Sequence, residues 1–134
     1  QVNDRYDNMW YEALGPEYVE LAFEYTRKYA DPDVKLFYND YGTYDRTKRQ
    51  YIYNLLCQLK EENLVDGIGM QGYWDLKNPG LQTVKETIEL YASTGLEIQF
   101  TEWSISSPDE SDANMALQAE RYAQTFRLLQ KMDT

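Results

Sequence analysis

Three short β-prone runs, each ending in an amide or a carboxylate, constrain the fold of this chain more than any other feature. The runs are residues 34–39, 66–71 and 96–102. Their last residues, Asn39, Gln71 and Glu102, are spaced by 32 and 31 residues, and one βα unit needs about 30 residues. The spacing predicts parallel strands that place these three side chains together at the carboxyl edge of the sheet, where such folds bind ligands.

Apolar residues at helical spacing predict four helices around these strands. The expected helices run from about residue 15 to 30, 46 to 63, 79 to 91 and 112 to 129. Asn78 is the expected N-cap of the third helix, and Ser111 or Asp112 that of the fourth. Residues 1–14 show no clear period and are expected to form a loop. The alternation of helix and strand predicts an α/β fold with right-handed crossovers.

Composition excludes several classes of function. The formal net charge of −10 argues against binding to nucleic acid or to an anionic membrane, and it is compatible with a neutral polysaccharide. The chain has no His, which excludes His-based metal sites and Ser-His or Cys-His catalysis. We expect neither a metal nor another cofactor. The one cysteine, Cys57, permits no internal disulfide and is expected to be buried.

Four segments resemble glycoside hydrolase family 10, the endo-β-1,4-xylanases that fold as (β/α)8 barrels. They are Leu36–Tyr41 (LFYNDY), Asp66–Gly72 (DGIGMQG), Gln99–Glu102 (QFTE) and residues 10–30. The resemblance identifies the three runs as strands five, six and seven, and it extends from helix four to helix seven. A complete barrel needs about 250 residues, so we expect residues 1–134 to form one partial catalytic domain, a partial (β/α)8 TIM barrel.

The resemblance implies a retaining endo-1,4-β-xylanase in which Glu102 is the nucleophile. The general acid/base glutamate of the family lies at the end of strand four in a Trp-x-x-x-Asn-Glu motif, which has no counterpart here. We therefore expect the isolated chain to be inactive on xylan, and to associate with the missing barrel segment or with another copy of itself. The resemblance also implies a secreted, periplasmic or cell-surface protein, although no signal-like or transmembrane run is present.

Two departures from the family pattern lie close to the proposed nucleophile. The family commonly has His where this chain has Tyr73, and Asp where it has Ser104. We expect Tyr73 and Ser104 to support Glu102 in their place. The strand-five motif also usually closes with Asn, where this chain has Gly42.

The remaining candidates would bind substrate. The aromatic candidates for sugar contact are Tyr41, Tyr73, Trp74 and Trp103. Trp74 has the best claim because its segment is expected to be a loop, whereas barrel packing is an equal alternative for Trp103. The neutral amides of Asn39 and Gln71 are expected to hydrogen-bond to sugar hydroxyls or to Glu102. Asp40 follows Asn39 on a strand and should point to the opposite face, in a structural role.

Two other interpretations remain open at this stage. The first is a catalytically inactive, carbohydrate-binding barrel segment, because the family's His and Asp are both replaced. The second is a free-standing flavodoxin-like or receiver-type α/β module. That module would need a phosphate loop, but Gly67 and Gly69 precede no helix directly.

Overall fold

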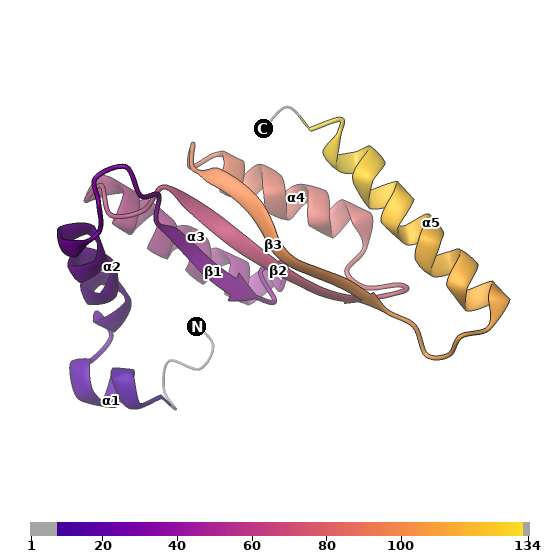
Figure 1. The fold of residues 1–134 in the computed structure, drawn as a ribbon, viewed down its shortest axis with the longest axis horizontal. Coiled ribbons are helices and arrows are strands. Elements are labelled where there is room, and N and C mark those ends of the chain that lie inside the picture. Colours follow the sequence, from indigo (N-terminus) through magenta and orange to yellow (C-terminus); the bar gives the residue numbers. More distant parts are fainter. Residues whose placement is uncertain (1–7, 133–134) are drawn as a thin grey trace.

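The structure, a computed structural model, describes residues 8–132 as a three-stranded parallel sheet with helices (Figure 1). The elements in chain order are α1 (Met9–Leu14), α2 (Tyr18–Tyr29), β1 (Phe37–Tyr41), α3 (Arg46–Glu61), β2 (Gly67–Asp75), α4 (Leu81–Ala92), β3 (Glu97–Ser106) and α5 (Asp112–Leu129). The strands lie in the order β1-β2-β3, and both neighbouring pairs are parallel. The predicted parallel α/β architecture is confirmed.

The strands reach further toward their carboxyl ends than the sequence predicted. β1 ends at Tyr41, β2 at Asp75 and β3 at Ser106. The last two extensions pair with each other through Trp74 and Ile105, both of which are buried. The polar residues around them suggested loops, but burial of one face keeps the segments extended.

Two helix boundaries differ from the prediction. Residues 9–14, expected as loop, form α1, and the Asn8 side chain caps it by accepting from the Tyr11 N–H at 2.8 Å. Residues 1–7 of that expected loop lie outside the described part of the chain. Asn78 does not cap α4, whose N-cap is Gly80. The Asn78 N–H instead donates to Asp75 at 2.7 Å in the turn after β2, whereas Ser111 caps α5 as predicted.

The hydrophobic core lies between the sheet and helices α3 and α4, which run along one side of the strands (Figure 1). Its buried members include Ile52, Leu56 and Leu59 of α3, Val84, Ile88 and Tyr91 of α4, and Ile68, Met70 and Trp74 of β2. Cys57 is only half-buried, contrary to expectation. Among the described residues, no helix is both long and apolar enough to cross a membrane.

Helix α2 contacts this core through a different face from the one predicted. Residues at helical spacing, Tyr18, Leu21, Ala22, Tyr25 and Tyr29, mark one face in the sequence. The Tyr25 and Tyr29 side chains of that face are nevertheless 60% and 75% exposed. Val19 and Phe23 pack against the core instead. The prediction failed because tyrosine is amphipathic and its position alone does not distinguish an inner from an outer face.

A buried ion pair joins α3 to β1. Asp40 is 0% exposed and Lys48 is 1% exposed, and the Lys48 Nζ donates to Asp40 Oδ1 at 2.9 Å. Asp40 also accepts from the Tyr38 hydroxyl and the Tyr41 N–H, both at 2.8 Å. The Lys48 ammonium lies 4.0 Å from the centre of the Tyr41 ring. Asp40 therefore has the structural role expected of it, on the helix side of the sheet.

Replacing Lys48 by Met should destabilise the fold by about 3–5 kcal/mol, because removing one partner leaves the Asp40 carboxylate buried without its counter-charge. The measurement is the free energy of unfolding by urea. Lys85→Met is the matched control, since Lys85 pairs with Glu89 at 3.4 Å on the surface and such pairs contribute about 0–1 kcal/mol. Equal losses in the two variants would contradict a structural role for the buried pair.

A second ion pair joins α2 to the start of β2. Asp66 Oδ2 accepts from Arg27 and from the Leu36 N–H, each at 2.7 Å. Partial burial of Asp66 opposes ionisation, but these two hydrogen bonds outweigh it and lower the pKa of the carboxyl. A carboxyl with a lowered pKa stabilises the fold above its ordinary pKa and loses that contribution as the pH falls through the lowered value.

Asp66→Asn should therefore reduce stability at neutral pH, and the difference from the native chain should shrink as the pH falls below about 4. Urea unfolding of both proteins across this range gives the comparison. A stability difference that grows on acidification would have the wrong sign for this interaction.

Candidate active site

A β-bulge in β3 determines which side chains meet at the carboxyl edge of the sheet. Met70 pairs with Phe100, but the next residue of β2, Gln71, pairs with Glu102, so Thr101 is the extra residue. Phe100 and Trp103 both pack on the helix side against Trp74. The two residues between them are both exposed. The bulge thus places Thr101 and Glu102 together on the face away from α3 and α4.

The three predicted strand ends do not lie in a single row. Gln71 and Glu102 are register partners, as the spacing predicted, and the third member of their row is Tyr41. Asn39 pairs with Gly69, two residues before Gln71 on β2. The nearly equal spacing in sequence predicted the correct face of the sheet for all three side chains. It wrongly placed Asn39 beside Gln71, because β1 extends to Tyr41, which is the residue that pairs with Gln71.

Asn39 reaches across the sheet to β3. Its Oδ1 accepts from the Thr101 hydroxyl at 2.6 Å, passing over Gly69 of the central strand. A Cβ at Gly69 would lie 2.5 Å from Asn39 Oδ1 and 2.8 Å from Thr101 Cγ2. The Asn39–Thr101 hydrogen bond therefore requires glycine at this position. Neither Thr101 nor Gly69 was predicted as a site residue from the sequence, although an isolated glycine inside a strand indicates a close approach.

Tyr73 contacts Glu102, as the sequence analysis expected. The Tyr73 hydroxyl donates a hydrogen bond to Glu102 Oε2, and both side chains are exposed. Ser104 is the register partner of Tyr73, but its hydroxyl makes no hydrogen bond to Glu102 within the described part of the chain. The expected support of Glu102 by Ser104 is therefore absent, whereas the contact with Tyr73 is present.

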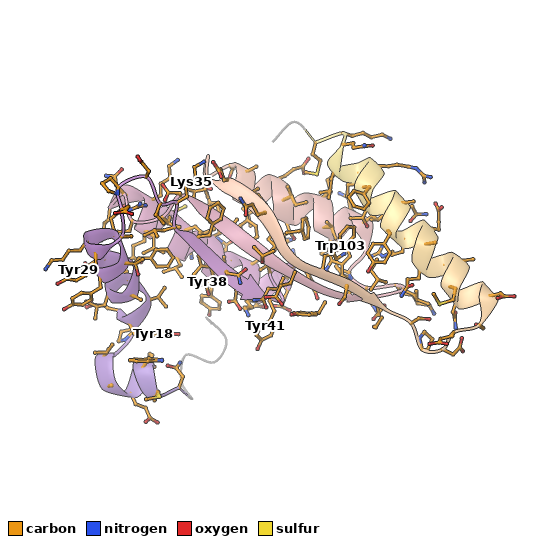
Figure 2. The ribbon with its side chains drawn as sticks, viewed as in Figure 1. Tyr18, Tyr29, Lys35, Tyr38, Tyr41 and Trp103 are labelled. Carbon is orange, nitrogen blue, oxygen red and sulfur yellow. The ribbon has the colours of Figure 1, made fainter. Side chains whose placement is uncertain are left out.

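Two of the aromatic candidates lie on the wrong face to contact a ligand beside Glu102. Trp74 is 3% exposed and belongs to the core, because β2 continues through it instead of turning into a loop. Trp103 packs against Tyr122 and Phe126 of α5, with ring centroids 4.9 and 5.2 Å away, as Figure 2 shows between β3 and α5. Packing is thus the role of both tryptophans in this structure.

Tyr41 and Tyr73 remain as aromatic residues on the open face. Tyr41 is at the end of β1 (Figure 2), where its ring lies beside the Lys48 ammonium. The Tyr44 hydroxyl donates to the Tyr73 carbonyl oxygen at 3.2 Å, which ties the loop after β1 to β2. Two tyrosines, Tyr41 and Tyr73, therefore flank the amide–carboxylate pair Gln71–Glu102.

The arrangement is suited to acid–base or nucleophilic chemistry on a polar, neutral ligand. Glu102 supplies a carboxylate, the Gln71 amide can both donate and accept, and Tyr73 supplies a hydroxyl. Within residues 8–132, no cluster of three or more His, Cys, Asp or Glu could hold a metal ion.

Comparisons with known proteins agree with this arrangement. A family model described as "Glycosyl hydrolase family 10" matches residues 1–134. A putative endo-1,4-beta-xylanase of Caldicellulosiruptor saccharolyticus is 43% identical over 137 residues, covering 96% of this chain and 44% of that protein. Endo-1,4-beta-xylanase A of Thermotoga neapolitana is 42% identical over 131 residues, covering 91% of this chain and 12% of that protein.

Solved structures share the fold of the described residues. The intracellular xylanase TsXylA of Thermoanaerobacterium saccharolyticum JW/SL-YS485 superposes with a TM-score of 0.84 at 40% identity, covering 91% of this chain and 38% of that one. A mutant of the same protein in complex with xylotetraose gives a TM-score of 0.84 at 39% identity, covering the same shares of the two chains. This chain thus spans less than half the length of each of these relatives.

Proposed function

The chain belongs to glycosyl hydrolase family 10, and on that premise we propose that its parent barrel is a retaining endo-1,4-β-xylanase. By parent barrel we mean these residues together with the remaining strands of a complete (β/α)8 fold. The described part of the chain has the fold of a partial barrel. The observation that carries the proposal is the position of Glu102, opposite Gln71 and hydrogen-bonded to Tyr73 at the carboxyl edge of the sheet.

In this reaction Glu102 attacks the anomeric carbon of a xylose unit while the glycosidic carbon–oxygen bond breaks and the acid group protonates the leaving oxygen, so that a covalent glycosyl ester forms. The neutral Gln71 amide can hydrogen-bond to a sugar hydroxyl or to the carboxylate without opposing its charge. The Tyr73 hydroxyl donates to one carboxylate oxygen, which fixes the plane of the carboxylate and leaves the other oxygen available for attack. Water then hydrolyses the ester, so the configuration of the sugar is retained.

Retaining hydrolysis needs a second carboxyl group about 5–5.5 Å from the first. The strands carry three other carboxylates, and none is suited to this role. Asp40 is buried on the helix side against Lys48, Asp75 bonds to the turn after β2, and Glu97 pairs with Lys35 at the opposite end of β3. We propose that the acid/base group of the parent barrel comes from strand four, next to β1.

The missing strand has a place to bind. A cavity of about 560 Å³ lies between α1, α2 and β1, and apolar side chains predominate in its lining. Its lining includes Trp10, Tyr18, Phe23, Phe37 and Asn39. Because β1 is an edge strand with its other neighbour absent among the described residues, a further parallel strand can pair there. We propose the missing barrel segment as this partner, with a second copy of the chain as the alternative.

The proposed substrate is xylan or a xylo-oligosaccharide. Two solved relatives contain such ligands, xylotetraose in TsXylA and xylotriose in a structure that is 36% identical to this chain. Tyr41 and Tyr73 are the exposed rings of this chain suited to contact sugar beside Glu102. The comparisons do not favour a flavodoxin-like module. An inactive carbohydrate-binding barrel remains the outcome to test against.

We also propose that the parent protein acts outside the cytoplasm, as a secreted, periplasmic or cell-surface enzyme. The support is the polymeric nature of xylan, which is too large to enter a cell intact. A relative described as intracellular shows that the fold itself does not decide the compartment. Fractionation of the source cells, with xylanase activity assayed in each fraction, tests this proposal.

Glu102→Gln in the parent barrel should abolish xylan hydrolysis and leave xylo-oligosaccharide binding largely intact, because the amide keeps the shape but is not a nucleophile. Release of reducing sugar and calorimetric binding of xylotetraose are the two measurements. Glu97→Gln is the matched control on the same strand, and it should keep the native rate. A near-native rate for Glu102→Gln would exclude Glu102 as the nucleophile.

These 134 residues alone should not hydrolyse xylan, because without a proton donor the leaving oxygen departs as an alkoxide, and general acid catalysis contributes about 10²–10⁴-fold. Co-expression with the missing upstream segment and final strand should restore activity, measured on soluble xylan. Robust turnover by the isolated chain would contradict this account and would require a carboxylate such as Asp40 to act as the acid.

A further inference from the structure

We propose that Thr101 is a positioning residue for Glu102, and that it acts through its hydrogen bond to Asn39 across Gly69. The inference rests on the proposed function, since it assigns a role to Thr101 in the reaction of Glu102. It also gives Asn39 a role other than the substrate binding expected from its place at a strand end.

The first step is the bulge itself. In a regular strand, side chains alternate between the two faces, so the residue after Thr101 would point toward the helices. Because Thr101 is inserted, Glu102 instead lies on the open face and pairs with Gln71. If Thr101 instead paired with Gln71 in a regular ladder, Glu102 would pair with Gly72 and its carboxylate would turn toward the apolar layer that contains Trp74 and Trp103. The register shift is thus what presents the carboxylate.

The second step concerns what holds the bulge in place. A bulged residue lacks its place in the regular ladder, so a side-chain contact is an available means of fixing it. The Thr101 hydroxyl donates to Asn39 Oδ1 at 2.6 Å, and Asn39 is itself fixed in β1 by its pairing with Gly69. The hydrogen bond therefore ties the extra residue of β3 to a strand that is not its neighbour.

The third step is the space that the contact needs. The side chains of Asn39 and Thr101 meet directly over Gly69, where a Cβ would lie within 2.8 Å of both. Every other residue type would push the two apart. Three residues on three strands are thus matched to one another, and the residue directly after Thr101 is Glu102.

The effect on the reaction follows from how little displacement an attacking carboxylate tolerates. Catalytic groups need placement within about 0.5 Å, and a misplacement of about 1 Å can lower a rate by about 10²-fold. Tyr73 fixes one oxygen of the Glu102 carboxylate, but it does not fix the backbone from which the side chain extends. The Thr101–Asn39 hydrogen bond supplies that second constraint.

The experiment compares three variants of the parent barrel. Thr101→Val keeps the size and branching of the side chain but removes the hydroxyl, Thr101→Ser keeps the hydroxyl, and Asn39→Ala removes the acceptor. Steady-state hydrolysis of an aryl β-xylobioside gives kcat and KM for each variant. Thr47→Val, which removes an exposed hydroxyl in the first turn of α3, is the matched control.

Thr101→Val should lower kcat by about 10-fold or more with little change in KM, and Thr101→Ser should retain most of the native kcat. The double variant Asn39→Ala with Thr101→Val should be no slower than the slower single variant, because both changes remove the same hydrogen bond. Thr47→Val should match the native enzyme. Native kcat in Thr101→Val would overturn the proposal, as would a rise in KM alone for Asn39→Ala.

A crystal structure of the Thr101→Val barrel gives a readout that does not depend on activity. We expect Glu102 to move away from the Tyr73 hydroxyl or the register shift opposite Gln71 to be lost. An unchanged Glu102 in that structure would overturn the positioning role even if the barrel proved inactive on xylan. Inactivity of the unmodified parent barrel would instead count against the proposed function, so the two failures are distinguishable. If Thr101→Val does not fold, the structure of Asn39→Ala makes the same test.

Discussion

The register between β2 and β3 is the constraint on which the candidate active site depends. This register determines which side chains are adjacent on the open side of the sheet for seven residues, and its single extra residue determines the face on which Glu102 lies. They are Gly69, Gln71, Tyr73, Gln99, Thr101, Glu102 and Ser104. The helix side holds this ladder in place, because Met70, Trp74, Phe100 and Trp103 interlock beneath it. The chemistry on one face thus depends on the packing of the other.

Much of the fold could be predicted from the sequence, because hydrophobic period and the spacing of strand ends are local signals. The parallel strands and the face occupied by Asp40 followed from them. The contact between Tyr73 and Glu102 was instead expected from the resemblance to glycoside hydrolase family 10. The bulge could not be predicted, since an inserted residue changes the alternation only by one position. Trp74 was misplaced because polar neighbours suggested a loop, while pairing with Ile105 keeps its segment extended and buried.

The three described strands are part of a barrel, and the groups proposed for catalysis are divided between these strands and the rest of the barrel. Asp40 and Lys48 join β1 to α3 on the helix side, and β1 has no second strand neighbour among residues 8–132. Its free edge and the adjoining cavity are the features that a further strand would use. Glu102, the proposed nucleophile, and Tyr73, which contacts it, lie within this chain, and the proposed proton donor would come from the strand added at that edge.

The central claim is that Glu102 forms the covalent bond to the sugar. The most direct test is to treat the parent barrel with an activated 2-deoxy-2-fluoro-β-xylobioside, which forms a glycosyl ester that hydrolyses slowly, and to locate the label by peptide mass spectrometry. The account predicts one label per barrel, on Glu102, and none in the Glu102→Gln variant. A label on any other carboxylate, or turnover of substrate with no trapped ester, would contradict it.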